Sequence, residues 1–499
     1  MRFPRLAGTE KAIANHPLLA ALYPLAKQSM VYMAGAVLIG MGYFVLVPLY
    51  TRYLTPRDFG AYALIEISLL ITVTTTQMGL GTTYLRWYAE TEASRRGEIL
   101  ASCVAGGIVA AALGGGILAA VMDGPLGRAW IGENARAAWI FLPLVLIRTA
   151  QGIFFSSLQA AQRPVAYVLS AVTRLLMLVT ACYWFVALHG ERVRGVLNCW
   201  LTGDGVCLLI LMGFCLPGMK LRVRKSLLIP MLRYGFPLVW SSLMALLLDA
   251  SGRYFLAQFQ SLAEVGRYTV GIKVTSLLSM GFLRPFGSAW AGAVFPIAHR
   301  PNAAITYTKI MGYALLVATL LAAITILFGP LLIRILAGRA YAGAQSLLPW
   351  LLLPVVFRFL EYWSSLPIYL KYKTQWLGPL ATVGTALCIV LNYFLVPRLG
   401  AQGAAIAWAG ALAATITLMT VIGRRYYRLP FDLRTCGFAA GVWALAIGGS
   451  RVTSSLSTRA GWGTSIAAAV ALLAACLFYF FWDVRASKSL FKGNAYAAD

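Results

Sequence analysis

Residues 137–158 read AAWIFLPLVLIRTAQGIFFSSL, a stretch that is apolar almost throughout and carries Arg148 near its middle. At about 1.5 Å per residue, a helix of this length crosses a hydrocarbon core roughly 30 Å thick. A guanidinium at that depth costs at least about 2.5–3.5 kcal/mol. We therefore predict that this segment spans a membrane and that Arg148 faces a hydrated cavity around which the other spans are arranged. The alternative is a structural arginine paired with a carboxylate or with carbonyl groups of a neighbouring helix.

The composition of the whole chain agrees with a polytopic membrane protein. Of its 499 residues, 60% are hydrophobic and 12% are charged, and the mean hydropathy is +0.76. The apolar runs are continuous rather than alternating, which favours helices over a β-barrel. Lys and Arg total 42 against 16 acidic residues. Because these charges are scattered between apolar runs, they indicate anionic membrane lipid and an anionic substrate, and they argue against nucleic acid.

The apolar runs predict an all-α fold with about fourteen transmembrane helices. The expected spans are 30–50, 60–80, 101–122, 137–158, 165–188, 195–216, 234–255, 265–287, 308–328, 345–368, 377–396, 404–422, 435–449 and 461–481. Residues 1–29 lack a short apolar core followed by a small-residue cleavage site, so we expect an uncleaved cytoplasmic segment. Lys and Arg are more frequent in the loops on the side of this segment, which predicts that both termini are cytoplasmic.

The sequence also contains an internal repeat. Four short motifs recur in order at separations of 205 to 208 residues: Phe59-Gly60-Ala61-Tyr62 with Val265-Gly266-Arg267-Tyr268, Gly124-Pro125-Leu126 with Gly329-Pro330-Leu331, Leu142-Pro143 with Leu348-Pro349, and Ser156-Ser157-Leu158 with Ser364-Ser365-Leu366. We predict two pseudo-symmetric six-helix bundles, 30–218 and 234–422. A basic cytoplasmic linker, 219–233, would join them, and 423–499 would add two further helices and a cytoplasmic tail. An even number of spans per half makes the repeats parallel, as in transporters that hold substrate between the halves.

Ionisable residues inside the predicted spans and away from their ends are the candidate site residues. The basic ones are Arg148, Arg174, Lys273, Arg284 and Arg358, and the acidic ones are Glu66, Asp204, Asp249 and Glu361. Arg148 and Arg358 lie near the middles of repeat-equivalent spans, so each half would present one guanidinium. Guanidinium forks suit the oxygens of a phosphate or pyrophosphate. For Arg358, an i,i+3 ion pair with Glu361 is the alternative.

The remaining charges have more than one interpretation. Arg174 and Lys273 lie about two turns inside their spans and can snorkel to an interface. Arg284 precedes Pro285, where a helix is expected to end or kink. For Asp249 an ion pair with Arg253 at i,i+4 is expected. The acids are the only candidates for coupling to H⁺ or Na⁺, with Asp204 and Glu66 preferred.

Polar residues follow one another in the second predicted span. These residues would either face a cavity or form hydrogen bonds between helices; they are Thr72, Thr74, Thr75, Thr76 and Gln77.

The eight cysteines lie in or at the edges of apolar spans without a CxxC pair, so we expect buried thiols rather than disulfides. The three histidines have no metal-ligand spacing. We expect no metal site and no cofactor, and the absence of GxxxxGK[ST] argues against an intrinsic ATPase.

Three further stretches resemble one family. They are Tyr53–Tyr62 (YLTPRDFGAY), Tyr234–Pro237 (YGFP) and Leu391–Ala405 (LNYFLVPRLGAQGAA). Together with the span number and the duplication, they are similar to the polysaccharide (O-antigen and exopolysaccharide repeat-unit) flippases of the multidrug/oligosaccharidyl-lipid/polysaccharide exporter superfamily. The related lipid II flippases place charge in the first span, whereas Met30–Tyr50 has none.

This resemblance implies a function and a location. It implies a V-shaped pair of bundles in the bacterial inner membrane that moves an undecaprenyl-pyrophosphate-linked oligosaccharide to the outer leaflet. A polysaccharide polymerase and a chain-length regulator would be partners. It does not supply individual site residues.

Two other functions compete with this one. A cation-coupled drug antiporter of the same superfamily would favour an acidic cavity, but the central pair here is basic. A membrane polysaccharide polymerase would carry a large outer loop, which the predicted spans do not leave. We therefore expect a flippase without a catalytic residue.

Overall fold

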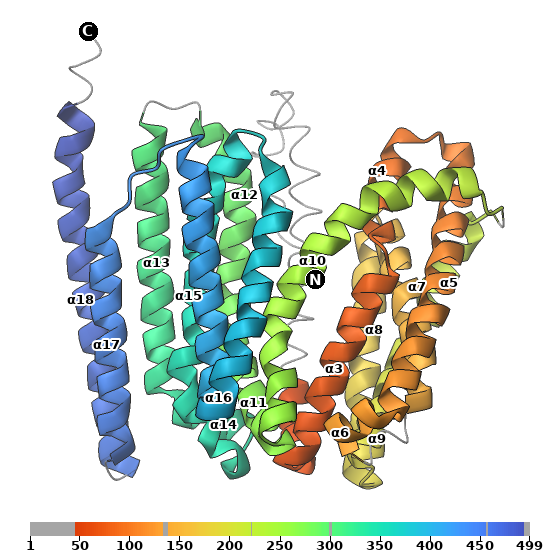
Figure 1. Ribbon diagram of the computed structural model, residues 1–499, viewed down its shortest axis with the longest axis horizontal. Helices are drawn as coiled ribbons and strands as arrows, with labels where there is room; N and C mark the ends of the chain where they lie inside the picture. The colour runs from red at the N-terminus through yellow and green to blue at the C-terminus, as the bar shows by residue number, and fades with distance from the viewer. Residues whose placement is uncertain (1–44, 133–137, 221, 299–301, 456–457, 494–499) are drawn as a thin grey trace, which may run out of the picture. The chain divides into compact units, whose positions relative to one another are not determined.

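The computed structural model describes residues 45–132, 138–220, 222–298, 302–455 and 458–493. Within these ranges every regular element is a helix, which confirms the all-α prediction (Figure 1). The predicted segment 1–29 lies outside the described residues, as does most of the predicted first span, 30–50.

Ten helices in the described part of the chain are long and apolar enough to cross a membrane. One of them covers Ala138–Ala160 and therefore matches the predicted segment around Arg148. Predicted spans eleven and twelve both fall within Thr374–Arg424. Predicted spans eight and thirteen are helical but are not among the ten. Span eight carries the charges of Lys273 and Arg284, and its helix is interrupted.

The chain folds into two compact units. Of the described residues, those in 45–53 and 65–243 form unit 1, and those in 54–64 and 244–493 form unit 2. Two of the three divisions fall inside helices, α3 (Pro56–Thr76) and α10 (Lys225–Phe259). The predicted linker, 219–233, is therefore partly helical, and the last two helices belong to unit 2.

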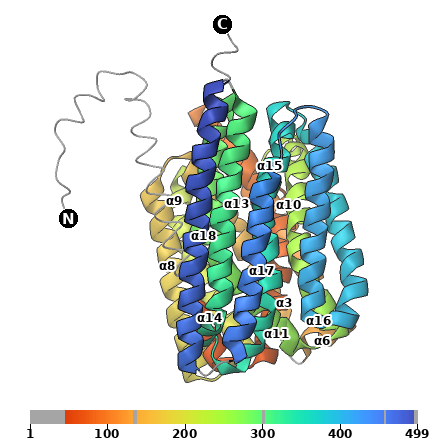
Figure 2. The ribbon, with the colours of Figure 1, turned by 90° about the vertical axis from the view of Figure 1, so that its left-hand side faces the viewer.

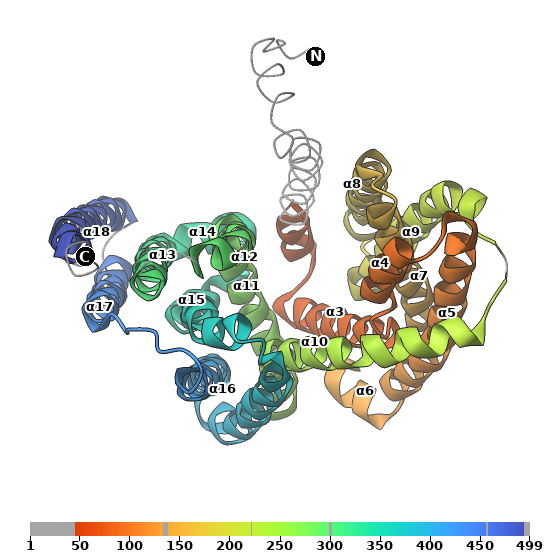
Figure 3. The same cartoon turned by 90° about the horizontal axis from the view of Figure 1, so that it is seen from above.

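Unit 1 is built around one central helix. Its elements are α4 (Leu80–Glu90), η1 (Ala93–Arg95), α5 (Arg96–Asp123), α6 (Pro125–Ile131), α7 (Phe141–Ala160), α8 (Pro164–Cys182), η3 (Tyr183–Leu188), α9 (Arg192–Cys215) and η4 (Leu216–Gly218). Helix α7 packs against α4, α5, α8 and α9 and lies among them in Figure 3. The buried core contains Leu80, Ile99, Ile153 and Leu211, together with Met231 from the first half of α10. This packing explains why that half of α10 belongs to unit 1.

Unit 2 contains the remaining helices. They are α11 (Leu262–Leu278), η5 (Ser279–Leu283), α12 (Arg284–Ala298), α13 (Ala303–Leu327), α14 (Gly329–Leu336), η6 (Arg339–Leu347), α15 (Leu348–Leu370), η7 (Thr374–Trp376), α16 (Leu377–Arg424), α17 (Leu433–Ser455) and α18 (Thr458–Gly493). Helix α13 packs against α15 on one side and against α17 and α18 on the other (Figure 2).

Helix α16 consists of two arms rather than one straight rod. Gly400 has φ 57° and ψ −133°, a conformation that residues with a Cβ rarely adopt. Trp376 just before α16 donates a hydrogen bond to Tyr426 just after it, at 3.2 Å. The two ends of α16 are therefore close together, which shows that the chain folds back at Gly400. The two arms therefore correspond to predicted spans eleven and twelve.

The order of the elements repeats between the units, as the motif spacing indicates. A short helix starts at Gly-Pro in both cases, α6 after α5 and α14 after α13. A long helix follows each of them, α7 in unit 1 and α15 in unit 2.

The two equivalent glycines Gly60 and Gly266 are in contact within unit 2. A methyl group on Gly60 would lie 1.8 Å from the carbonyl oxygen of Leu262, and one on Gly266 would lie 2.1 Å from that of Pro56. The repeated Phe/Val-Gly motif is thus a close backbone contact between α3 and α11.

The cysteines follow the sequence prediction. All eight are free thiols, seven of them buried and Cys436 partly so.

Candidate functional site

The candidate site residues of unit 1 form one ion cluster. Arg148 from α7 and Arg174 from α8 both contact Asp204 from α9, with Nε–Oδ distances of 2.6 and 2.5 Å. The Asp204 side chain is fully buried, whereas those of Arg148 and Arg174 are 18% and 23% exposed. Two guanidiniums share one carboxylate, so this unit 1 cluster (Arg148, Arg174, Asp204) has a formal charge of +1.

Polar and aromatic neighbours hold the unit 1 cluster in place. Gln151 donates a hydrogen bond from Nε2 to the backbone oxygen of Asp204 at 2.6 Å. The Trp200 ring lies under the Arg148 guanidinium, 4.7 Å from the ring centroid, a cation–π distance. Residues Gln151 and Trp200 were not among the predicted site residues. Trp200 had a sequence signal, because Trp408 follows it by 208 residues, the separation of the repeat.

Arg148 retains unused hydrogen-bond donors. Its Nε atom donates to Asp204, and its two terminal amino groups donate to no described residue. A guanidinium has five N–H donors in a fixed fork, so the terminal edge of the fork is the part that recognises paired oxygens. Arg148 is therefore paired with a carboxylate of a neighbouring helix, the alternative stated for it from the sequence, and its two terminal amino groups have no hydrogen-bond partner among the described residues.

Two residues of the polar run in the second predicted span form hydrogen bonds to α7. The hydroxyl groups of Thr76 and Thr149 are 2.9 Å apart. Gln77 Nε2 lies 3.5 Å from the backbone oxygen of Arg148. Thr76 and Gln77 therefore form hydrogen bonds between helices, one of the two interpretations of this run.

The candidate residues of unit 2 form a second cluster with a different charge. Arg358 from α15 donates from Nη1 to Glu361 at 2.8 Å and from Nη2 to Asp249 of α10 at 2.9 Å. Trp408 Nε1 also donates to Asp249, at 3.0 Å. The unit 2 cluster (Arg358, Asp249, Glu361) has a formal charge of −1, and the Asp249 side chain is 44% exposed.

These contacts settle two sequence alternatives. The i,i+3 ion pair between Arg358 and Glu361 is present. The expected ion pair between Asp249 and Arg253 is wrong: Asp249 pairs with Arg358, and the buried Nε of Arg253 has no hydrogen-bond partner among the described residues. The guanidinium of Arg358 reaches Asp249 from the neighbouring helix.

The other predicted site residues lie on α3, α11 and α12. Lys273 lies on α11 and Glu66 on α3, both partly buried. Arg284 is exposed and starts α12 directly after the π-helix η5. The helix interruption expected at Arg284-Pro285 is therefore present, in the form of a π-turn.

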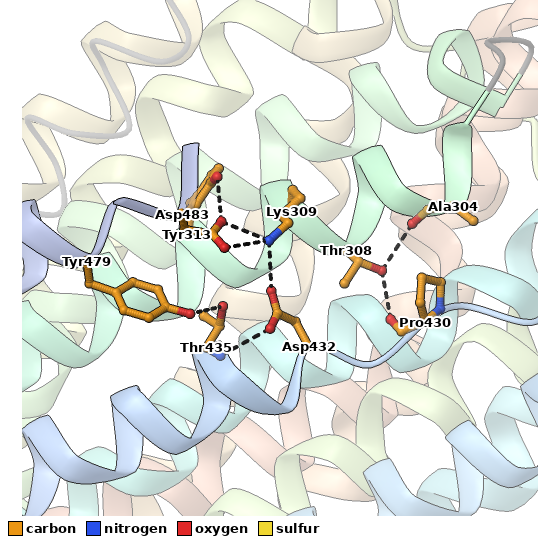
Figure 4. Close-up of polar contacts among 9 residues, drawn as sticks. All are labelled: Ala304, Thr308, Lys309, Tyr313, Pro430, Asp432, Thr435, Tyr479 and Asp483. Atoms are coloured by element: carbon orange, nitrogen blue, oxygen red, sulfur yellow. Dashed lines mark hydrogen bonds and ion pairs between the residues drawn. The ribbon is translucent and has the colours of Figure 1, made fainter. Parts of the chain in front are cut away.

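A third charged cluster joins α17 and α18 to α13 within unit 2, and the sequence did not predict it. Lys309 of α13 contacts Asp432 at 3.2 Å and both carboxylate oxygens of Asp483 of α18 at 2.8 Å (Figure 4). Tyr313 also donates to Asp483, at 2.9 Å. Asp432 immediately precedes α17 and accepts a hydrogen bond from the backbone N–H of Thr435, as an N-cap residue does.

Asp432 lies outside the apolar part of the helices, and its environment favours the carboxylate. Burial alone would raise the pKa of Asp432, but the Thr435 hydrogen bonds and the Lys309 ammonium hold this pKa below its ordinary value. Lys309, Asp432 and Asp483 carry a formal charge of −1, so they form a compact ionic contact between α13, α17 and α18.

Several solved structures have a similar fold. The chain is similar to a structure titled "Lipid II flippase MurJ, inward closed conformation", with a TM-score of 0.71 and 11% identity over 91% of this chain and 99% of that one. It is also similar to an inward-facing multidrug resistance MATE family transporter of the MOP superfamily, with a TM-score of 0.61 and 15% identity over 77% and 94%. An outward-facing MATE structure gives 0.53, with 15% identity over 80% and 94%. At these identities the similarity establishes the fold alone.

Sequence comparison gives the family. Comparison with the curated proteins found no match. A family model described as "Polysaccharide biosynthesis protein" matches residues 25–298, more than half of the chain. This match covers unit 1, including Arg148, Arg174 and Asp204, and continues through α12. With multiple apolar helices and a flippase-like fold, the chain is a multi-pass membrane protein that belongs to the polysaccharide biosynthesis protein family.

Proposed function

We propose that this protein translocates an undecaprenyl-pyrophosphate-linked oligosaccharide from the inner to the outer leaflet of a bacterial cytoplasmic membrane. The observation that most supports this is the unit 1 cluster, in which two guanidiniums share one carboxylate and Arg148 presents its terminal amino groups. A pyrophosphate supplies the paired anionic oxygens that such a fork binds. The lipid II flippase MurJ has a similar fold.

The remaining steps follow from the same charges. The pyrophosphate would contact Arg148 and Arg174, the glycan would occupy a polar path, and the polyprenyl chain would stay in lipid beside α17 and α18. Translocation makes and breaks no covalent bond, so no catalytic residue or cofactor is required. Anionic membrane lipid would bind the basic loops, and a polymerase and a chain-length regulator would act on the exported repeat unit.

The coupling ion is assigned to unit 2 instead of to Asp204. Asp204 lies between two guanidiniums, which stabilise its charged form. Asp249 and Glu361 exceed their single arginine partner by one charge, so the unit 2 cluster would bind H⁺ or Na⁺. Glu361→Gln removes that excess. We expect it to reduce the dependence of transport on an ion gradient while it leaves binding of the lipid unchanged.

The proposal is tested by transport in proteoliposomes. Wild-type protein should move a defined undecaprenyl-pyrophosphate oligosaccharide between leaflets, measured by access of an external glycan-modifying enzyme. Arg148→Gln keeps Asp204 paired with Arg174 but removes the terminal amino groups of the guanidinium, so we expect at least about a tenfold slower rate, equivalent to about 1.4 kcal/mol. Gln375→Leu, at an exposed position in η7, is the control. No translocation by folded wild-type protein would refute the proposal.

A second function has one observation in its favour. The net negative unit 2 cluster with its exposed Asp249 suits a cationic compound, as in a drug antiporter. Uptake of a lipophilic cation driven by a gradient, together with no movement of the lipid-linked sugar, would select this alternative.

A further inference from the structure

A pocket outside the two arginine clusters lies at one end of unit 2. It has a volume of about 500 Å³. This is within the roughly 300–1,000 Å³ range of small-molecule sites. Its polar lining comes from four elements: η6 contributes Gln345, the start of α15 contributes Trp350, the turn of α16 contributes Gln402, and the end of α17 contributes Arg451. With Ile326 of α13, five separate elements converge on one cavity.

Three polar side chains of the pocket are available to a ligand. The side-chain amides of Gln345 and Gln402 and the indole N–H of Trp350 form no hydrogen bond with any described residue. Elsewhere in the same unit, comparable groups are used internally: Trp408 donates to Asp249, and Gln260 donates to the Val396 carbonyl. The pocket therefore gathers amide and indole groups whose hydrogen-bonding capacity is unused.

The chemistry of these groups favours a sugar. Each glutamine amide both donates and accepts hydrogen bonds, which is what a sugar hydroxyl requires of its partner. An indole offers an apolar face for the C–H face of a pyranose and an N–H donor at its edge. Only one charged side chain, Arg451, lines the pocket, so a polyanion is not its best ligand. We infer that this pocket is a saccharide-binding site.

The position of the pocket relates it to the exported glycan. Ser450 and Arg451 lie near the end of α17, whereas the Lys309 cluster lies at its start. The two features are therefore at opposite ends of unit 2. With both termini cytoplasmic, as proposed above, the pocket opens on the outer side. The site would hold sugars of the translocated product, so this inference rests on the proposed orientation and function.

The test is direct binding of a sugar that carries no lipid. Full-length protein in nanodiscs is titrated with the oligosaccharide released by mild acid from the host's lipid-linked repeat unit, and binding is followed by saturation-transfer NMR. We expect saturable binding, weakened about 3- to 10-fold by Gln402→Leu and by Trp350→Leu, as for loss of one hydrogen bond or ring contact. Gln402 is exposed, so its variant should fold. Gln375→Leu, an exposed glutamine distant from the pocket, should bind as the wild type does.

The outcomes separate this inference from the proposed function. Arg148→Gln should retain full saccharide binding, even though it should slow transport, because Arg148 belongs to unit 1. The inference is overturned if folded wild-type protein shows no saturable signal, or if Gln402→Leu binds as tightly as the wild type. Displacement of the sugar by sn-glycerol 3-phosphate would also overturn it, since it would indicate a lipid headgroup on Arg451.

Discussion

Arg148 and Arg358 occupy equivalent helices of the two units, yet their guanidiniums are used in opposite ways. Arg148 contacts a fully buried aspartate through Nε and leaves both terminal amino groups without a described partner. Arg358 uses both terminal amino groups on two carboxylates. The unit 1 cluster is therefore cationic and can accept an anion, whereas the unit 2 cluster is anionic and can accept a cation. The two equivalent helices thus each carry an arginine near the middle, but the two arginines have different partners.

The largest difference between the two clusters should appear on removal of the central aspartate. Asp204→Asn leaves two guanidiniums without a counter-charge at a buried position, which we expect to cost about 3–5 kcal/mol. Asp249→Asn should cost only about 1 kcal/mol, because Asp249 is partly exposed and Arg358 keeps Glu361. Thermal unfolding of the purified variants in the same detergent measures both. Equal destabilisation would show that the two clusters are equivalent.

A smaller effect is expected from the tryptophan of the unit 2 cluster. Trp408→Phe keeps an aromatic ring and removes the N–H that donates to Asp249, with an expected cost of about 1.5 kcal/mol for a bond to a charged group. Trp443→Phe is a matched control, since the indole N–H of Trp443 donates to no described residue. If both variants lose the same stability, the hydrogen bond to Asp249 contributes nothing.

The smallest effect concerns the Lys309 cluster, which has the net charge of the unit 2 cluster but joins α17 and α18. The pKa of Asp432 is lower in the folded protein than its ordinary value. Its contribution, about 1 kcal/mol, is therefore present above the unfolded pKa near 3.9 and is lost as the pH falls through the folded pKa. Asp432→Asn should destabilise the protein at about pH 6 and have little effect near about pH 3. A pH-independent difference in melting temperature would contradict this assignment.

The sequence predicted the features that depend on local composition and on the repeat. Apolar runs locate the helices, so residues 137–158 correspond closely to the observed span Ala138–Ala160. The recurring Gly-Pro and Leu-Pro motifs identify equivalent helices and hence the paired arginines. These signals depend on order along the chain, which the fold preserves.

The sequence could not predict which side chains meet across helices. Asp204 pairs with Arg148 and Arg174, and Lys309 with Asp483, because of how each helix is rotated about its own axis. Apolar spans that are hydrophobic on all sides do not specify that rotation. Asp204 was preferred as a coupling acid because the sequence does not reveal that two arginines contact it. The repeat spacing of Trp200 and Trp408 was an available signal that points to both clusters.

Equilibrium binding of undecaprenyl pyrophosphate to the purified protein tests the charge difference between the units most directly. We predict that Arg148→Gln weakens binding at least about tenfold, while Arg358→Gln changes it less than about twofold. Circular dichroism and melting curves would verify that both variants are folded. Equal loss in both variants, or undiminished binding by Arg148→Gln, would contradict the assignment of the anion site to unit 1.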